Sequence, residues 1–74
     1  MECYKNIGGS SGVYAFECGN EYIKVQFSTG KTYLYTYQSA GKDNIEHMKI
    51  LARRGKGLNS FINTRVKRLY DKVV

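Results

Sequence analysis

Few side chains of this 74-residue chain are of the types that perform catalysis. His47 is its single histidine and could serve as a general base, yet the sequence places no nucleophile or carboxylate to work with it. Cys3, Cys18 and His47 lack the close paired spacing of a zinc site. We therefore expect no enzyme, no metal, no cofactor and no small-molecule substrate. A small hydrolase that depends on His47 is the alternative, and a single Cys3–Cys18 disulfide also stays open.

Lys and Arg are unevenly distributed along the chain. The net charge is +6, and residues 42–74 hold nine Lys or Arg against three acidic residues, whereas residues 1–41 hold three of each. Such asymmetry indicates a polyanion as partner. The alternative is a solvated surface that keeps a small protein soluble. The candidate phosphate-binding residues are Arg53, Arg54, Lys56, Arg65, Arg68 and Lys72.

The sheet that must support these cations is expected in residues 13–37, as an antiparallel meander with strands at 13–18, 21–27 and 31–37. Tyrosine occupies every second position of the third strand, so that Tyr33, Tyr35 and Tyr37 share one face. Those rings are expected to contribute to the core, with each hydroxyl at its rim. Tyr22 points to the other face and is the better candidate for stacking on a nucleic-acid base.

The first hairpin loop is expected at Gly19-Asn20, with glycine at the first central position. This loop would pair Cys18 with Glu21. It would also set Phe16 opposite Ile23, so that the inward face of the first strand becomes Tyr14, Phe16 and Cys18.

The second hairpin loop is expected at residues 28–30, with Gly30 in the left-handed conformation. That loop pairs Ile23 with Tyr35 and places the tyrosines on the core face. A two-residue loop at 29–30 would instead turn Leu34 inward and the tyrosines outward. We prefer the three-residue loop because three rings cover more core area than one leucine.

Two helices are expected after the sheet, at about 43–54 and 58–72, with residues 38–42 as the connection. Asp43 and Glu46 resemble a capping box, and Gly55 is a natural terminator. Ile50 points away from the apolar face of the first helix, which consists of Ile45, Met48, Leu51 and Ala52. The apolar stripe of the second helix consists of Leu58, Phe61, Ile62, Val66, Leu69 and Val73, and it includes Arg65.

The predicted fold is therefore α+β: a three-stranded antiparallel meander followed by two helices packed on one face of the sheet. Residues 1–74 form a single small domain, in which residues 1–12 are an arm and a Gly- and Ser-rich flexible segment, 13–37 the meander and 43–72 the helical pair. The N-terminus lacks the apolar stretch of a secretion signal, and no window is apolar enough to span a membrane. We expect a cytoplasmic protein without membrane contact.

Several of these segments together resemble the KTSC domain, which occurs at the C-terminus of some lysyl-tRNA synthetases and as small free-standing bacterial proteins. Tyr33-Leu34-Tyr35 resembles its central Tyr-x-Tyr motif, residues 11–16 its first strand and residues 25–30 its hairpin. Residues 57–70 resemble its ending, with Asn63 and Tyr70 at motif positions. Gln38-Ser39-Ala40 and Lys67 depart from the pattern, where the family has a proline turn and an arginine. The resemblance implies no defined chemistry beyond a suggested RNA-binding role.

The sequence therefore predicts a non-catalytic nucleic-acid-binding module, with RNA such as tRNA as partner and the cations of residues 42–74 as phosphate contacts. The alternative is a protein-interaction module, in which Ile50 and Leu34 anchor an acidic protein partner that the cations attract.

Overall fold

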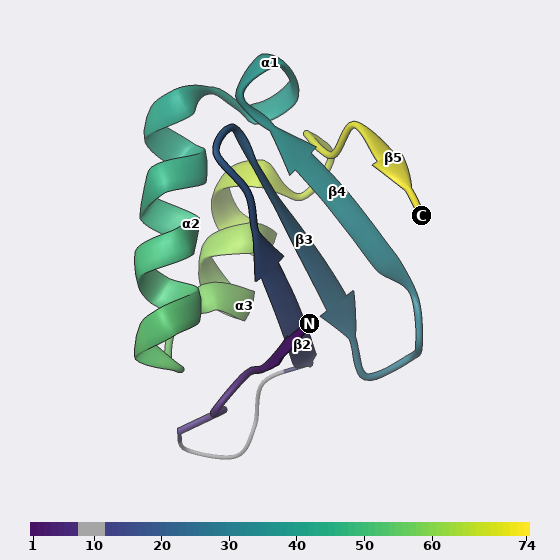
Figure 1. The fold of residues 1–74 in the computed structure, drawn as a ribbon, viewed down its shortest axis with the longest axis vertical. Helices are drawn as coiled ribbons and strands as arrows, with labels where there is room; N and C mark the ends of the chain where they lie inside the picture. Colours follow the sequence, from purple (N-terminus) through teal and green to yellow (C-terminus); the bar gives the residue numbers. More distant parts are fainter. Residues whose placement is uncertain (8–11) are drawn as a thin grey trace.

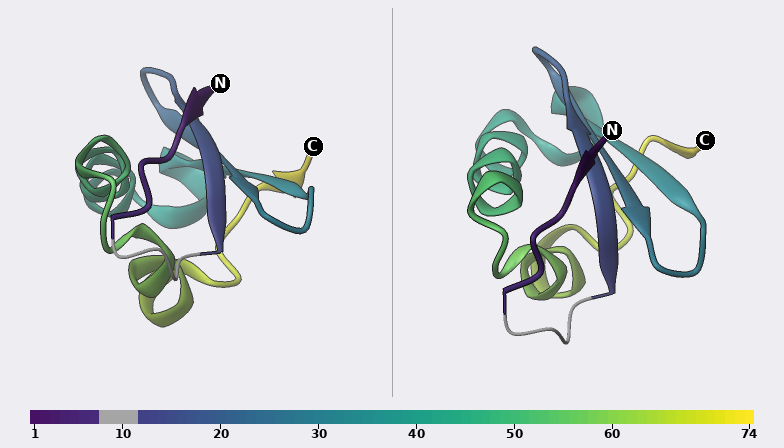
Figure 2. Two further views of the ribbon diagram at one scale, coloured as in Figure 1. Left: turned by 90° about the horizontal axis from the view of Figure 1, so that it is seen from below. Right: turned by 60° about the horizontal axis from the view of Figure 1, so that its bottom comes forward.

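The computed structural model describes residues 1–7 and 12–74. These residues form a five-stranded antiparallel sheet in the order β1-β2-β3-β4-β5, with the helices on one of its faces (Figures 1 and 2). The strands are β1 (Glu2–Cys3), β2 (Val13–Cys18), β3 (Tyr22–Phe27), β4 (Thr32–Thr36) and β5 (Lys72–Val73). The predicted α+β class is confirmed. The predicted meander corresponds to β2, β3 and β4, and two short edge strands extend it. The predicted flexible segment lies largely outside the described residues.

The second hairpin adopts the predicted register. Ile23 pairs with Tyr35 and Val25 with Tyr33. Gly30 has φ +98°, and its amide donates to the carbonyl of Phe27, as expected for a loop closed by a left-handed glycine. Tyr33 and Tyr35 therefore lie on the face that the helices cover, and Tyr35 is 1% exposed.

The first hairpin differs from the prediction, because its loop lies one residue later. The Gly19 amide donates to the carbonyl of Tyr22, and Cys18 pairs with Ile23 rather than with Glu21. The ring of Tyr22 occupies the space that a Cβ on Gly19 would fill, with ring atoms 2.0 Å from that position. Gly19 therefore lies beneath this ring, directly after β2, and is not a central residue of the loop.

A bulge in β2 reverses the prediction for Tyr14. Val13 pairs with Phe27 and Ala15 with Gln26, so Tyr14 is the extra residue between them. Its side chain is 60% exposed, while Val13 is buried. Phe16 is buried as predicted, and Cys18 is half-buried.

The chain leaves β4 one residue earlier than predicted and forms a short helix, α1 (Tyr37–Ala40). Thr36 caps this helix: its side chain accepts from the Ser39 amide, and the Ser39 hydroxyl accepts from the Thr36 amide. Tyr37 is therefore not a third tyrosine of the strand. The predicted capping box at Asp43 and Glu46 is wrong, since the cap of the next helix is Gly41 and no side chain caps it.

Helix α2 (Lys42–Arg54) buries its predicted face of Ile45, Met48, Leu51 and Ala52 on the sheet. Gly55 ends it in the left-handed conformation with φ +79°, as predicted. Ile50 points away and is 57% exposed, also as predicted.

The last helix is shorter than predicted. Helix α3 (Leu58–Phe61) continues into the π-helical turn η1 (Ile62–Val66), and the chain then leaves the helix. The Asp71 amide donates to the carbonyl of Leu34 and the Val74 amide to that of Thr32, so β5 pairs with β4. The chain thus covers an otherwise open sheet edge, which a longer helix would leave unpaired. Leu69 and Val73, predicted as core, are 41% and 50% exposed.

The N-terminal arm packs against the helices. Tyr4 is 6% exposed, and its hydroxyl accepts from the amide of Leu58. The amide of Ile7 donates to the carbonyl of Gly55, while the Ile7 side chain stays exposed. The arm therefore lies against both the start of α3 and the end of α2.

Candidate nucleic-acid interface

The six predicted phosphate-binding residues are all exposed. Arg53, Arg54 and Lys56 lie at the end of α2, on both sides of Gly55. Two of them stand in the last turn of the helix, where a cation is favoured by the negative end of the helix dipole. This end of α2 is therefore a rigid support for a group of positive side chains.

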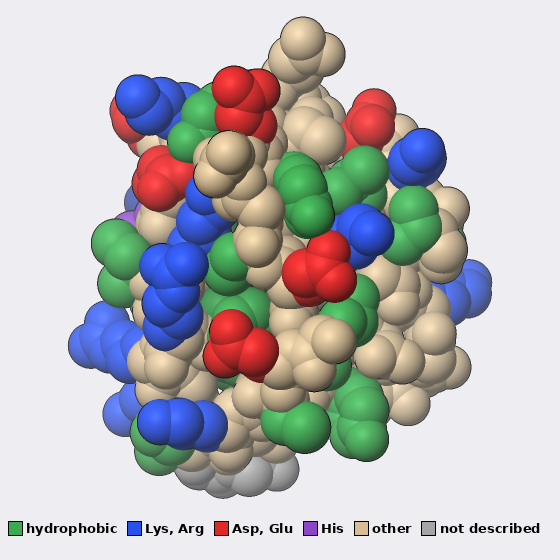
Figure 3. Space-filling model, in the orientation of Figure 1, with side chains coloured by type: hydrophobic (Ala, Val, Ile, Leu, Met, Phe, Trp, Pro, Cys, Tyr) green, Lys and Arg blue, Asp and Glu red, His purple; other side chains and the backbone are tan. Residues whose placement is uncertain are grey.

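A fourth cation at this end was not predicted. A Cβ on Gly55 would lie 2.6 Å from the Cβ of Lys5, because the N-terminal arm passes directly over the glycine. Lys5 thus joins the chain neighbours Arg53, Arg54 and Lys56 near Gly55, and we call these four residues the Gly55 cluster. Figure 3 shows Lys and Arg side chains along the side of the molecule where α2 lies. The only feature of the sequence that indicates this position of Lys5 is Gly55 itself, because a glycine without a side chain lets the N-terminal arm come close.

The other three predicted residues do not join the Gly55 cluster. Arg65 lies on η1 and Arg68 follows it, whereas Lys72 lies in β5, at the sheet edge opposite α2 (Figure 1). Arg65 was predicted inside the apolar stripe, yet its side chain is exposed while its neighbour Val66 is fully buried. The wider π-helical turn changes the angle between successive residues, which places Arg65 outside the stripe.

The exposed cations are not neutralised by neighbouring acids. Within residues 1–7 and 12–74 there are two ion pairs, Lys24–Glu17 at 3.8 Å and Lys49–Glu46 at 2.8 Å. Neither pair includes any of the six predicted residues. Their positive charge is therefore directed at solvent.

A groove lies between the helix-covered face of the sheet and η1, with a volume of about 410 Å³. Its apolar walls are Phe27, Tyr33, Tyr35, Ile62 and Tyr70, and we call it the tyrosine groove. Asn63, Lys67 and Arg68 line it from the helical side. The four residues at which the sequence resembles the KTSC motif, Tyr33, Tyr35, Asn63 and Tyr70, all line this one groove.

The aromatic walls pack edge to face. The centroid of the Tyr33 ring lies 5.4 Å from that of Phe27 and 4.8 Å from that of Tyr70, and the ring planes are nearly perpendicular in both pairs. Tyr70 also contacts Tyr35, at 6.5 Å between ring centroids. Edge-to-face packing holds these rings in fixed orientations. Tyr70 is nevertheless 38% exposed, so one of its surfaces is open to the groove.

The hydroxyl of Tyr35 opens into the tyrosine groove. It has no hydrogen-bond partner among the described residues, although every buried side-chain nitrogen or oxygen in that part of the chain has one. The hydroxyl must therefore reach solvent, although the residue as a whole is 1% exposed, and the groove that Tyr35 lines is the path. Burial raises the pKa of Tyr35 to about 12, so the hydroxyl stays protonated at neutral pH.

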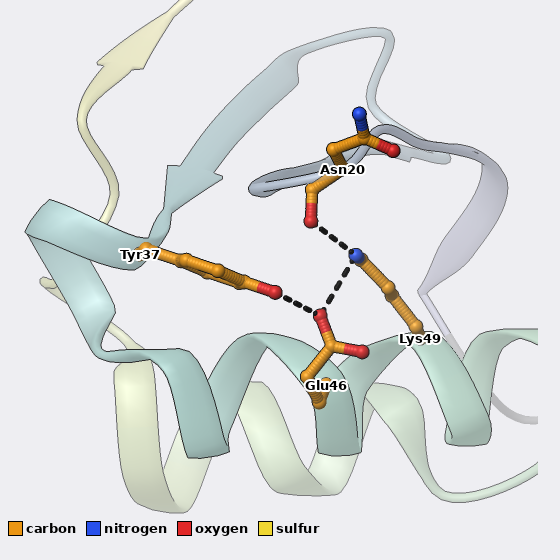
Figure 4. Close-up of polar contacts among 4 residues, drawn as sticks. All are labelled: Asn20, Tyr37, Glu46 and Lys49. Carbon is orange, nitrogen blue, oxygen red and sulfur yellow. Dashed lines mark hydrogen bonds and ion pairs between the residues drawn. The ribbon is translucent and has the colours of Figure 1, made fainter.

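Lys49 does not contribute to a basic surface, because it is buried in a polar network (Figure 4). Its ammonium group donates to the backbone carbonyl of Asn20 at 3.0 Å and to the carboxylate of Glu46 at 2.8 Å. Tyr37 donates to the same carboxylate oxygen at 2.6 Å. These bonds, that from Lys49 first, lower the pKa of Glu46, and the bond to Glu46 raises the pKa of Tyr37 to about 12.

The remaining candidate groups are the imidazole of His47, the ring of Tyr22 and the two thiols. His47 is exposed, and its ring packs against that of Phe61 at 4.7 Å between centroids. The hydroxyl of Tyr22 donates to Glu17, and Lys24 lies over its ring. Cys3 lies opposite Ala15 in the pairing of β1 with β2, and the thiols of Cys3 and Cys18 form no disulfide. In the part of the chain that the structure describes, no three His, Cys, Asp or Glu residues are grouped to hold a metal ion.

Comparisons with known proteins do not place the chain in a family: no family model, no curated protein and no solved structure matches it. The KTSC resemblance therefore stays a prediction. Among the described residues, no helix has the length and hydrophobicity to cross a bilayer.

Proposed function

We propose that this protein is a non-catalytic nucleic-acid-binding module with RNA as its partner. The observation that carries the proposal is that the predicted cations are exposed and that none of them is in an ion pair within the described residues. Free cations on a rigid surface displace condensed counterions from a phosphate backbone, which supplies most of the affinity for nucleic acid. The Gly55 cluster provides four such cations on one end of α2.

RNA is favoured over duplex DNA because the second cationic site borders an aromatic groove. Arg68 and Lys67 line the tyrosine groove together with Asn63 and three tyrosines. Proteins read RNA mainly through unpaired nucleotides, whose bases can be splayed out and stacked on aromatic side chains. A structured RNA such as tRNA presents both stretches of duplex backbone and unpaired loops.

Titration of labelled tRNA and of duplex DNA at about 50 mM and about 200 mM salt tests the proposal. We expect binding of tRNA at the lower salt concentration, with an affinity that falls at least tenfold at the higher one. Arg68→Ala should weaken binding of tRNA more than binding of duplex DNA. The absence of tRNA binding at low salt would contradict the proposal.

A protein-interaction module is the second candidate, and the exposure of Ile50 is the observation that favours it. Ile50 lies on α2 with 57% of its surface open to solvent, four residues from Arg54. An apolar anchor beside cations is the surface that an acidic protein would recognise. Ile50→Ala should leave tRNA binding unchanged. If it reduces recovery of an acidic protein from nuclease-treated lysate, the second candidate gains support.

A further inference from the structure

The tyrosine groove has the dimensions of a small-ligand site rather than of a surface for a folded partner. Its volume of about 410 Å³ lies near the lower end of the range of about 300–1,000 Å³ typical of small-molecule pockets. A duplex or a folded domain is far too large to enter it. The groove is bounded on one side by η1 and on the other by β4 and the loop after β3.

The groove also has the charge that suits an anionic ligand. Lys67 and Arg68 line it, and none of the described residues that line it is Asp or Glu. Arg can bind a phosphate in a bidentate manner with its planar guanidinium group, which Lys cannot do. A ligand that places a phosphate against Arg68 would meet no opposing carboxylate there.

The interior of the groove offers the faces of two aromatic rings and two groups that can form directional hydrogen bonds. Tyr33 and Tyr70 supply partly exposed rings, on which a nucleobase can stack. The Tyr35 hydroxyl opens into the same space without a partner among the described residues, and Asn63 carries both donor and acceptor groups. Unpaired bases expose their hydrogen-bonding edges to such groups.

We propose that the tyrosine groove binds one unstacked nucleotide of a single-stranded RNA segment. The base packs against Tyr33 and Tyr70, its edge bonds to the Tyr35 hydroxyl and Asn63, and its phosphate binds Arg68 and Lys67. This inference rests on the RNA-binding function proposed above and adds to it the form of RNA that the groove selects. The Gly55 cluster binds phosphates of either form, whereas the groove accepts only an unpaired nucleotide.

The test compares a labelled single-stranded RNA of about 12 nucleotides with a duplex of the same sequence, each titrated with the full chain. Tyr35→Phe removes the hydroxyl that opens into the groove and keeps the buried ring. We expect it to weaken single-strand binding about twofold to tenfold, the range for one lost hydrogen bond, and to leave duplex binding unchanged. Asn63→Ala, on an exposed side chain that cannot affect the core, should act in the same direction.

Two variants serve as controls. Tyr14→Phe removes the hydroxyl of an exposed tyrosine outside the groove and should change neither affinity. Arg53→Ala in the Gly55 cluster should weaken both forms of RNA by a similar factor. Thermal unfolding of Tyr35→Phe shows whether its fold is retained.

The outcomes separate this inference from the function on which it rests. If both RNA forms bind while Tyr35→Phe and Asn63→Ala behave like Tyr14→Phe, the nucleotide site is wrong and the RNA-binding function stands. If neither form binds at low salt, both are wrong. A poly-glutamate peptide that binds as tightly as the single strand would show that charge alone determines binding, which overturns the site for a nucleobase.

Discussion

Lys49 lies in the strongly basic half of the chain, yet its own role is structural. The residue is 6% exposed and lies beneath the β2–β3 hairpin, where its ammonium group joins the Asn20 carbonyl to the Glu46 carboxylate. A buried carbonyl or charge that loses its partner costs the free energy of its desolvation. The count of Lys and Arg in residues 42–74 therefore overstates the charge available to a ligand.

Lys49→Met tests this role, because methionine keeps the length of the apolar stem and removes the ammonium group. We expect a loss of about 1–3 kcal/mol in the free energy of unfolding, measured by urea denaturation. Lys42→Met, on the exposed start of the same helix, is the control and should change stability by less than about 0.5 kcal/mol. Equal effects of the two substitutions would show that the network contributes nothing.

The protonation of Glu46 makes the stabilising contribution of this network depend on pH. Its pKa is lowered below the ordinary 4.5 by the hydrogen bond from Lys49 first, and then by that from Tyr37. Its folded pKa lies below its unfolded pKa, so its contribution to stability is complete above pH 4.5 and is lost as the pH falls through the folded value. We expect unfolding free energies measured between about pH 6 and about pH 3 to fall less steeply in Glu46→Gln than in the parent.

Asp43→Asn is the control for this pH dependence. Asp43 lies on the same helix and is exposed, with no hydrogen bond or ion pair within the described residues. Its pH profile shows how far the loss of another carboxylate of α2 changes the pH dependence. A Glu46→Gln profile parallel to both would mean that the network does not shift this proton equilibrium.

Among the elements, the junction between α2 and the N-terminal arm depends on a glycine. Gly55 and Gly57 both have positive φ, at +79° and +87°, but a Cβ would meet the Lys5 side chain at 2.6 Å only at Gly55. Gly57→Ala should therefore cost about 1 kcal/mol for the left-handed conformation alone. Gly55→Ala should cost at least about 1 kcal/mol more, because the arm must also move.

Urea denaturation of both variants measures this difference. In Gly55→Ala the amide of Ile7, which donates to the carbonyl of Gly55, should also exchange faster with solvent. Equal losses in the two variants would contradict close packing between the arm and the end of α2.

Strands β2, β3 and β4 and helix α2 were predictable because their signals are local. Alternation determined which residues of β3 and β4 share a face, and the predicted three-residue loop then directed Tyr33 and Tyr35 toward the core. The position of the first loop was not predictable, because it depends on the Tyr22 ring covering Gly19. The bulge that exposes Tyr14 likewise depends on contacts across two strands.

The end of the last helix was not predictable for a different reason. Helical spacing of apolar residues continues to Val73, and the sequence holds no glycine or proline that would stop the helix before it. The chain nevertheless leaves the helix after η1 and pairs β5 with β4, a contact between residues nearly forty positions apart. The tyrosine groove shares this origin, since Tyr70 reaches Tyr33 only because the helix has ended.

For the whole molecule, the prediction of one basic surface is only partly met. Three of the six predicted cations lie around one glycine, where Lys5 joins them, while Arg68 lies at the tyrosine groove and Lys72 at the far sheet edge. The sequence identifies the excess of positive charge but not how the cations are distributed between separate sites. That distribution depends on where η1 and β5 end. Two separate cationic sites suit an RNA that has both paired and unpaired segments.

The salt dependence of RNA binding tests the central claim most directly. The slope of log affinity against log salt concentration changes by about 0.7–0.9 for each phosphate contact removed. The double variant Arg53→Ala/Arg54→Ala should therefore bind tRNA more weakly, with a slope shallower by about 1.4–1.8 than that of the parent. Lys31→Ala/Lys42→Ala, which removes two exposed charges outside the Gly55 cluster and the tyrosine groove, should keep the parental slope. Identical slopes for all three proteins, or an affinity independent of salt, would contradict phosphate binding by the Gly55 cluster.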